Sequence, residues 1–318
     1  MGEFDLIRRY FLPLASRQQG SSLVMGPGDD CAIQRLPAGQ DLVFSIDTLV
    51  EGVHFPHRYH PDYLGWRSLA VAASDLAAMG AQPECFTLAL TLPKADEDWL
   101  EGFARGLAEA AQAFGLALAG GDTTAGPLTL TLQVHGTVSR GNAICRNGAR
   151  PGDLVAVSGT LGDAGAALAY LSETEPSADA AAVLERYHRP QPRLQLGVAA
   201  APFASAGIDI SDGLLADLGH ILEASEVGAR LESGSLPLSP ALVRLTGERA
   251  PELALRAGDD YELCLTFPPE RWESAPEALR RQLTVIGTIE AAPGLYLDGT
   301  DCGPSGPDAG FDHFRRRQ

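Results

Sequence analysis

Apolar residues in the first half of the chain follow the periods of strands and helices in turn. Several short apolar runs have the length of a strand, and the run from 128 to 138 alternates apolar with polar side chains. Two longer segments carry apolar residues at helical spacing, and Gly115 is a natural end for the second of them. Strands are therefore predicted at 41–47, 85–92, 116–121 and 128–138, and helices at 61–80 and 96–114.

The second half repeats this mixture after a break in the pattern. Residues 139–152 are rich in Gly, Asn, Arg and Pro, a composition typical of a connection between domains. We therefore predict an N-terminal domain over 1–145 and a C-terminal domain over 146–318. In the second domain, strands are predicted at 154–157, 207–210, 261–267, 284–289 and 294–297, with Ala-rich helical segments between 163 and 204 and a helix at 213–225.

The order of these elements indicates the fold class. It favours an α/β protein of the α+β type, with two α/β sandwich domains whose sheets are mainly antiparallel or mixed. No Gly-x-Gly-x-x-Gly opens a helix after the first strand, so a doubly wound Rossmann sheet is not expected. The Walker A pattern is also absent, so any nucleotide must be held in another way.

Composition and charge narrow the classes of partner. The chain has 318 residues, of which 45% are hydrophobic, and its 24 basic and 41 acidic residues give a net charge of −17. This charge argues against nucleic acid or an anionic membrane as a partner. Five widely spaced cysteines without a Cys-x-x-Cys pair indicate a reducing compartment, and no apolar stretch reaches 18 residues, so we expect a cytoplasmic protein.

Carboxylates at the ends of predicted strands are the most informative feature. Asp47, Asp122 and Asp209 each finish an apolar run, Asp212 follows closely, and Asp75 lies inside an apolar helical pattern. Two carboxylates about 4 Å apart repel by roughly 4 kcal/mol at an effective dielectric near 20, so such a group is hard to keep ionised without a cation. If these segments deliver their carboxylates to one place, the sequence predicts a magnesium site there.

Each of these motifs also has a plainer interpretation. The segment from 26 to 30 has the composition of an ordinary turn, and Gly120 with Gly121 suits either a hairpin or the approach of backbone amides to a phosphate. Ser211 or Asp212 could cap the helix that follows, although a cap does not explain Asp209 as well. Arg146 and Arg150 are either surface charges or phosphate contacts.

Eight motifs together resemble the thiamine-monophosphate kinases, of the superfamily that includes aminoimidazole ribonucleotide synthetase and selenophosphate synthetase. The likeness extends over nearly the whole chain, and Leu-Val-Glu-Gly-Val-His-Phe is its most specific phrase. The matching segments are 28–32, 45–55, 74–81, 120–123, 146–153, 209–214, 258–263 and 310–311.

The resemblance implies an activity and its requirements. Members of this family phosphorylate thiamine monophosphate to thiamine diphosphate with ATP, assisted by several Mg²⁺ ions. It also implies a homodimer in which the N-terminal domains pair their sheets and hold ATP near the interface. Direct in-line transfer is the expected mechanism, because a phosphate acceptor is already anionic and needs no strong base.

The same resemblance assigns residues to the ligands. Metal ligands are expected at Asp30, Ser45, Ile46, Asp47, Asp75, Asp122, Asp209 and Asp212, with Asp75, Asp209 and Asp212 in the catalytic role. The family pattern has Thr where this chain has Ile46, so the contact expected there is through the backbone carbonyl. ATP contacts are expected from Gly121, Asp122, Arg146 and Ser211, and acceptor contacts from His54, Glu262 and Phe311.

Two rival functions fit the same motifs. One is an enzyme of the same superfamily that acts on a different acceptor or activates an amide oxygen with ATP. The other is a nucleotide-binding sensor or assembly factor that keeps the metal ligands but does not turn over. A substrate screen separates the first rival from the kinase, and slow ATP consumption with tight nucleotide binding would indicate the second.

Overall fold

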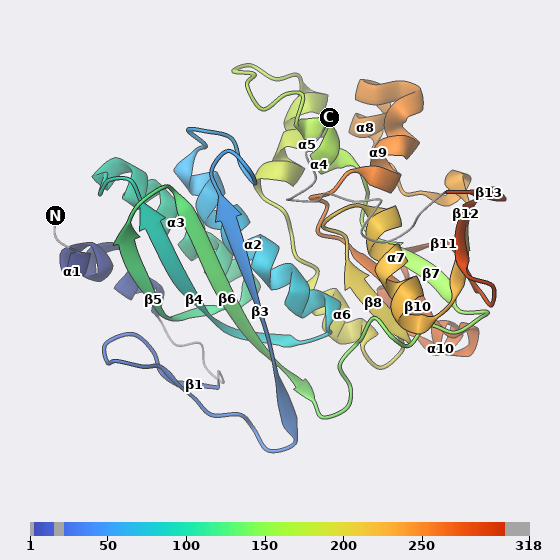
Figure 1. Ribbon diagram of the computed structural model, residues 1–318, viewed down its shortest axis with the longest axis horizontal. Coiled ribbons are helices and arrows are strands. Elements are labelled where there is room, and N and C mark those ends of the chain that lie inside the picture. The colour runs from blue at the N-terminus through green and yellow to red at the C-terminus, as the bar shows by residue number, and fades with distance from the viewer. Residues whose placement is uncertain (1–2, 16–21, 303–318) are drawn as a thin grey trace. The chain divides into compact units, whose positions relative to one another are not determined.

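The computed structural model describes residues 3–15 and 22–302, and the chain divides into two compact units (Figure 1). The first comprises Met1–Leu76 and Ala81–Ala143, and the second comprises Ala77–Gly80 and Ile144–Gln318. The change from one unit to the other after Ala143 lies within the turn-rich segment of residues 139–152.

The first unit is built on a four-stranded sheet of order β3-β6-β4-β5. The two contacts of β6, with β3 and with β4, are antiparallel, and β4 pairs with β5 in parallel. The sheet is therefore mixed, and β3 and β5 are its two edges. The strands span Gln40–Val50 (β3), Gln82–Leu92 (β4), Ala117–Ala125 (β5) and Thr129–Ser139 (β6).

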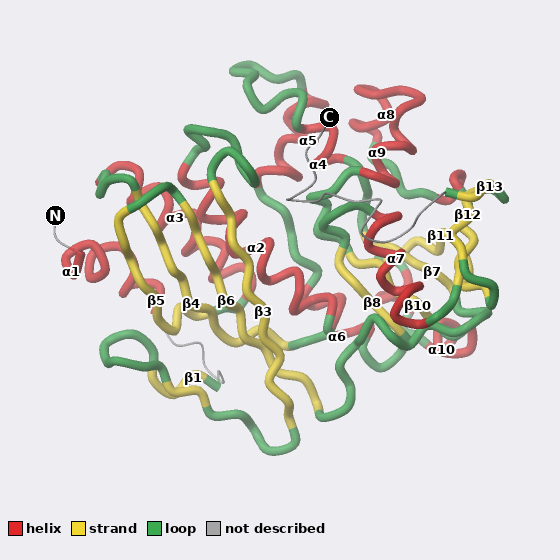
Figure 2. The backbone as a smooth tube through the Cα atoms, viewed as in Figure 1, coloured by secondary structure: helices red, strands yellow, loops and turns green. Residues whose placement is uncertain are grey.

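Two long helices, α2 (Pro61–Ala78) and α3 (Glu97–Phe114), run behind this sheet (Figures 1 and 2). Helix α3 begins after Asp96, whose side chain accepts a hydrogen bond from the Trp99 amide at 3.2 Å. It ends at Gly115, which adopts the left-handed conformation with φ 72°. Its apolar side, with Leu100, Phe103 and Leu107 fully buried, supplies much of the core of this unit.

Glycine allows the two helices to approach each other closely. A Cβ atom on Gly65 of α2 would lie 2.2 Å from the Phe103 carbonyl oxygen, and one on Gly106 of α3 would lie 1.9 Å from the Asp62 carbonyl oxygen. These contacts are shorter than any real side chain permits, so both positions require glycine for this packing.

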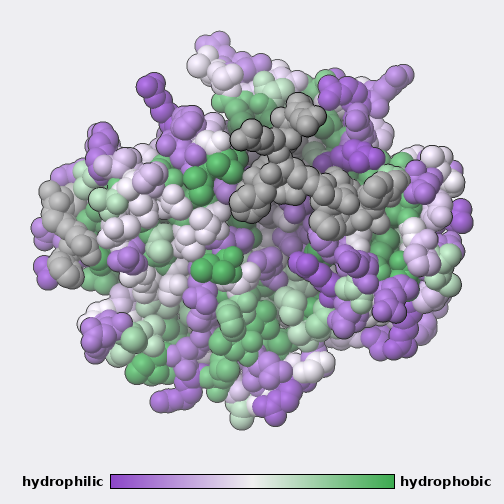
Figure 3. Space-filling model, in the orientation of Figure 1, coloured by the Kyte–Doolittle hydropathy of each residue, from purple (hydrophilic) through white to green (hydrophobic). Residues whose placement is uncertain are grey.

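The other face of the same sheet is open in the part of the chain that the structure describes. Phe44 and Ile46 of β3 are 61% and 63% exposed, and their cross-strand partners on β6 are His135 and Gln133. Figure 3 views this side and shows hydrophobic and weakly polar residues interspersed over the strands.

Short elements flank this sheet at the N-terminal end of the chain. They are α1 (Glu3–Leu6), a π-helical turn η1 (Ile7–Phe11), a 3₁₀ turn η2 (Leu12–Ala15), and the antiparallel pair β1 (Leu23–Met25) and β2 (Ile33–Gln34). None of these was predicted from the sequence, because each is too short to show a period.

The second unit contains a seven-stranded sheet of order β13-β12-β9-β11-β7-β10-β8. All neighbouring pairs are antiparallel except β12 with β9. The strands span Leu154–Ser158 (β7), Ala206–Asp209 (β8), Gly228–Leu231 (β9), Leu263–Phe267 (β10), Leu283–Glu290 (β11), Gly294–Leu297 (β12) and Thr300–Asp301 (β13).

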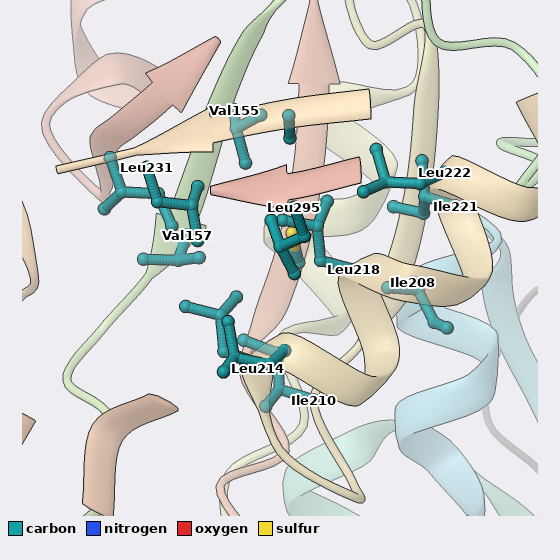
Figure 4. Close-up of a cluster of buried hydrophobic side chains, with 14 of the residues drawn as sticks. Val155, Val157, Ile208, Ile210, Leu214, Leu218, Ile221, Leu222, Leu231 and Leu295 are labelled. Carbon is teal, nitrogen blue, oxygen red and sulfur yellow. The ribbon is translucent and has the colours of Figure 1, made fainter. Parts of the chain in front are cut away.

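The helices of the second unit are shorter. Helix α7 packs on the sheet, and its Leu214, Leu218 and Ile221 meet Val155 and Val157 of β7 in the core drawn in Figure 4. Full burial of each such side chain stabilises the fold by about 1.5–3 kcal/mol. The helices are α4 (Asp163–Ala167), α5 (Ala178–His188), α6 (Leu194–Ala200), α7 (Leu214–Ser225), α8 (Pro240–Thr246), α9 (Ala250–Arg256), α10 (Pro269–Ser274) and α11 (Glu277–Arg280), with 3₁₀ turns η3 (Ser233–Ser235) and η4 (Gly247–Arg249).

The predicted fold class is confirmed, since both units combine helices with mainly antiparallel or mixed sheets. The sequence pattern did not reveal β9, α8 or α9, which lie between 226 and 260. Polar residues interrupt the apolar pattern in this region, so it matches neither the spacing of apolar residues in a helix nor the alternation of a strand. Within the described residues, no helix has the length and apolar character needed to cross a bilayer.

Candidate functional site

Three of the predicted metal ligands meet at the edge of the first sheet. Ser45 and Asp47 lie two positions apart on β3, so their side chains leave the same face, the one that α2 covers. The Ser45 hydroxyl donates a hydrogen bond to Oδ2 of Asp75 on α2. Burial, followed by the charge of Asp75, raises the pKa of Asp47 to about 6.

This pair of carboxylates has the donor chemistry of a magnesium ligand set. Asp75 lies between Ser74 and Leu76, which are both fully buried, so its carboxylate lies at the border of the buried face of α2. Burial is the main reason why the pKa of Asp47 is raised, and the negative charge of Asp75 adds to it. Mg²⁺ is usually bound by one or two carboxylates, with waters and phosphates completing its coordination, and this pair fits that need.

Two neighbouring predicted residues take different positions. Ile46 points to the open face of the sheet and is 63% exposed, so its side chain faces away from Asp75, and a metal contact at this position would be through the backbone. His54 lies in the turn after β3, where its Nδ1 accepts a hydrogen bond from the Val50 amide at 3.0 Å. In the neutral ring this bond places the proton on Nε2, which makes that atom a donor.

A cavity of about 630 Å³ lies beside β5, the other edge of the first sheet. Asp30, Gly121 and Asp122 line it, together with Phe11 and Arg8 from the N-terminal turns. The cavity thus combines apolar side chains, carboxylates and a glycine pair whose amides a phosphate could approach. Three predicted site residues are brought together here.

The sheet order separates these two groups of carboxylates. Asp47 pairs with Leu132, Leu132 with Leu88, and Leu88 with Gly121. Asp47 and Asp122 therefore lie at nearly the same position along the strand direction, but on the two opposite edge strands of the sheet. Three strand spacings place them about 14 Å apart. The single cluster expected from the sequence is therefore not formed between Asp47 and Asp122 within one copy of this unit.

A third group of carboxylates lies at one edge of the sheet in the second unit. Strand β8 ends at Asp209, which is buried, and Ser211 and Asp212 follow in a tight loop before α7. One oxygen of Asp217, on the first turns of α7, accepts the amides of Ser211, Asp212 and Gly213 at 3.0, 3.0 and 3.1 Å. Asp217 therefore fixes the backbone from which Asp212 projects.

Asp217 is itself electrostatically unusual. Burial, and then the charges of Asp209 and Asp212, raise its pKa to about 8, although its bonds to the loop amides act in the opposite direction. Asp217 thus lies close enough to Asp209 and Asp212 for their charges to act on it. The metal-binding role predicted for Asp209 and Asp212 stays a prediction.

Glu262 lies beside this group, immediately before β10. Its carboxylate is fully buried and binds two guanidinium groups, those of Arg186 at the end of α5 and Arg193 before α6. Arg193 uses Nε and Nη2, at 2.6 and 2.5 Å, and Arg186 uses Nη2 at 2.5 Å. The Ser158 hydroxyl, at the end of β7, donates to the same carboxylate at 2.5 Å.

Glycine makes room for this carboxylate. A Cβ atom on Gly159 would lie 2.2 Å from Oε1 of Glu262, and Gly159 also has a positive φ of 57°. The loop that carries Glu262 is itself strained, because Asp259 and Tyr261 have φ values of 70° and 50°. Strain of this kind is retained mainly where the surrounding structure fixes a functional geometry.

The remaining predicted residues are less informative. Arg146 is exposed, and its carbonyl accepts a hydrogen bond from the Ser225 hydroxyl at 2.9 Å. Phe311 lies outside the described residues, so its predicted contact with the acceptor stays a prediction. Across 3–15 and 22–302, no three His, Cys, Asp or Glu side chains gather closely enough to hold a metal by themselves.

Sequence reasoning missed three residues of the second-unit site: Asp217, Arg186 and Arg193. Asp217 had the same signal as Asp75, an acid within an apolar helical run, here Leu-Leu-Ala-Asp-Leu. The two arginines lie in Arg-Tyr-His-Arg-Pro-Gln-Pro-Arg, a basic segment in an acidic chain. This contrast between a basic segment and an acidic chain could have identified the two arginines as candidate ligands of an anion.

Both halves of the chain match families of known proteins. Residues 28–138 match the N-terminal domain model of AIR synthase related proteins, and residues 150–299 match the C-terminal domain model. The chain is 48% identical to the thiamine-monophosphate kinase of Escherichia coli (strain K12) over 321 residues, which covers 98% of each protein.

Solved structures give the same result. The crystal structure of thiamine-monophosphate kinase from Stenotrophomonas maltophilia K279a has a TM-score of 0.87 and 43% identity, covering 95% of this chain and 98% of that one. A structure of AaThiL complexed with AMPPCP and TMP has a TM-score of 0.80 and 32% identity, covering 98% and 97%. The chain therefore belongs to the thiamine-monophosphate kinase family, among the AIR synthase related proteins.

Proposed function

We propose that this protein transfers the γ-phosphoryl group of ATP to thiamine monophosphate, forming thiamine diphosphate and ADP, with the help of several Mg²⁺ ions. The observation that carries this proposal is the presence of neighbouring carboxylates, Asp47 with Asp75 and Asp209 with Asp212, in a chain without a Walker lysine. A relative that covers 98% of the chain has been solved with AMPPCP and TMP, which supports this choice of substrates.

The metal would be held by the carboxylate groups described above. Asp47 and Asp75 with Ser45, Asp30 with Asp122, and Asp209 with Asp212 each offer the hard oxygen donors that Mg²⁺ prefers. When bound, Mg²⁺ neutralises charge on the phosphates and orients them for in-line displacement. Burial, and then neighbouring carboxylates, raise the pKa values of Asp47 and Asp217, so these acids lie near other acids, as ligands of a shared cation would.

The protein's own groups would position the reactants. The cavity beside β5 offers the Gly121 amide and apolar side chains to ATP. Nε2 of His54 would donate to the acceptor. The acceptor phosphate is already anionic, so the chain needs no general base, and its task is to align two anions that repel each other.

The direct test of this function is ³¹P NMR of the purified protein with ATP, Mg²⁺ and thiamine monophosphate. The proposal expects thiamine diphosphate and ADP to appear together, and only in the complete mixture. Production of ADP without thiamine diphosphate would indicate another acceptor. Tight ATP binding without any product would indicate the sensor.

We propose the cytoplasm as the location, in keeping with the free thiols of the described cysteines.

We also propose that two copies of the chain pair through the open face of the first sheet. Phe44 and Ile46 form an apolar area there, and β3 is an edge strand of 11 residues. Long exposed edges and apolar sheet faces are normally covered in soluble proteins.

Substitution of Phe44 by Asp is expected to break this pairing. The buried aspartate would lack a partner, and its burial would weaken association by about 100-fold or more. Analytical ultracentrifugation over a range of concentrations would measure the dissociation constant. Val243→Asp is a matched control, because Val243 is 45% exposed on α8 of the other unit and should leave association unchanged. Equal dissociation constants for wild type and Phe44→Asp would rule out this interface.

Substitution of His54 by Ala is expected to weaken acceptor binding without affecting ATP. Loss of one hydrogen bond from the ring should raise the KM for thiamine monophosphate about 10-fold. His57→Ala is the control, since that side chain is 79% exposed in the same loop. Steady-state kinetics with each substrate varied in turn would decide, and equal rises in both KM values would remove His54 from the acceptor site.

A further inference from the structure

Arg186 and Arg193 form a cationic pair that the roles assigned above do not use. Both guanidinium groups bind the single carboxylate of Glu262, so among residues 3–15 and 22–302 one positive charge has no counter-charge in direct contact. The side chains of Arg186 and Arg193 are 22% and 32% exposed, whereas that of Glu262 is fully buried. The buried carboxylate therefore holds the two guanidinium groups in place, while the arginine side chains remain partly exposed to solvent.

The arginines keep unused hydrogen-bond donors. A guanidinium group has five N–H donors. In the part of the chain that the structure describes, Arg186 commits Nη2 and Arg193 commits Nε and Nη2, all to Glu262. The remaining N–H groups of two adjacent guanidinium groups suit an anion with several oxygens, and a phosphate matches this geometry well.

Nearby acids do not cancel this charge by contact. Asp163 is bonded to hydroxyl groups, since its carboxylate accepts from Thr160 at 2.7 Å and from Ser239 at 2.5 Å. Burial raises the pKa of Asp260 well above its usual range, although the charge of Arg186 acts in the opposite direction, and Asp260 accepts the Gly162 amide at 2.8 Å. Glu262 is thus the acid that holds the two arginines.

The pair lies next to the carboxylates proposed to hold metal. Leu263 of β10 pairs with Asp209 of β8, and the Ile210 amide donates to the Glu262 carbonyl at 2.8 Å. The end of β7 adds Ser158, whose hydroxyl also accepts the Leu263 amide at 2.8 Å. One edge of this sheet therefore carries both a carboxylate group for cations and an arginine pair for an anion.

We propose that Arg186 and Arg193, held in place by Glu262, bind the phosphate group of the acceptor. This inference rests on the proposed function, which supplies a phosphate monoester as acceptor. The residues assigned to ATP already include the glycine-lined cavity and Arg146, whereas the acceptor phosphate has no cationic side chain assigned to it. Glu262 is then a positioning residue that acts through the two arginines.

The test compares Arg186→Gln and Arg193→Gln with wild type in steady-state kinetics at saturating Mg²⁺. The KM for thiamine monophosphate should rise about 10- to 100-fold in each variant, because a hydrogen bond between charged groups is lost. The KM for ATP should stay within about twofold of wild type. Arg230→Gln is the matched control, since Arg230 also pairs with a glutamate, Glu290, but on the exposed surface of the same unit.

A second measurement separates binding of phosphate from a structural role. Unphosphorylated thiamine, used as a competitive inhibitor, lacks the group that the arginines would contact. Its inhibition constant should be unchanged in both variants, while Arg186→Lys should recover part of the affinity for thiamine monophosphate.

Three results would overturn the inference. They are unchanged KM values for the acceptor, a rise confined to ATP, or an equal loss of affinity for thiamine and thiamine monophosphate. Failure of the wild-type protein to form thiamine diphosphate would instead contradict the proposed function itself, so the two failures are distinguishable.

Discussion

Substitution of Asp212 by Asn is expected to lower kcat by about 10²–10³-fold, while the protein keeps its fold. The neutral amide removes one of the negative charges that would hold Mg²⁺ beside Asp209. Without that ion, the negative charge on the reacting phosphates would not be neutralised in the transition state. The fold should tolerate the change, because Asp212 lies half-buried in a loop that Asp217 fixes through backbone amides. Turnover at excess Mg²⁺ and the thermal unfolding midpoint are the two measurements.

The control for this substitution is Asp298→Asn. Asp298 belongs to the same unit and accepts a hydrogen bond from the Ser233 amide at 3.0 Å, but it lies on the surface. It should change neither kcat nor the dependence on Mg²⁺. Asp75→Asn should reproduce the loss seen for Asp212→Asn. Near-normal turnover of a folded Asp212→Asn protein would mean that this carboxylate is not an essential metal ligand.

The strands that carry the site were predictable because burial leaves a clear pattern. A run such as Leu-Val-Phe-Ser-Ile-Asp predicts a strand with an acid at its end. The structure ends β8 at Asp209 as predicted, whereas β3 continues past Asp47 to Val50. The order of strands within a sheet leaves no such pattern. The sequence therefore could not show that β6 and β4 separate Asp47 from Asp122.

Pairings between distant residues were equally hidden. Glu262 lies 76 and 69 positions away from Arg186 and Arg193, and no local rule connects them. The resemblance assigned Glu262 to the acceptor, and the structure adds that its oxygens bind arginines and a serine. Asp217 was the exception, because an acid within the apolar run Leu-Leu-Ala-Asp-Leu could have been found from the sequence.

Asp217 gives the second large expected effect. Asp217→Ala removes the acceptor of three amides in the loop that presents Asp212. Each buried donor left unsatisfied costs about 1–3 kcal/mol, partly offset by removal of a buried acid, so we expect a loss of roughly 2–4 kcal/mol in the free energy of unfolding. Activity should fall about 10²-fold as Asp212 loses its position. Unchanged stability and activity would show that the loop does not depend on these bonds.

Asp217→Asn separates the role of the oxygen from that of the charge. The amide oxygen can still accept the three bonds, so the loop should persist, but the side chain no longer titrates. In wild type, the pKa of Asp217 is raised from 3.8 to about 8, so the folded state binds a proton that the unfolded state releases. Between these two values the contribution of Asp217 to stability therefore falls as pH rises, by about 1.4 kcal/mol per pH unit at most.

The free energy of unfolding of the two proteins, measured with urea and without divalent metal, tests this sign. Other titrating groups, Asp47 and Asp260 among them, are common to both proteins, so the difference between wild type and Asp217→Asn isolates Asp217. We expect Asp217→Asn to gain stability relative to wild type as pH rises from about 5 to about 8. A difference that stays constant over this range would mean that Asp217 is already ionised in the folded protein, and that the acids at this strand end repel less than their burial and spacing imply.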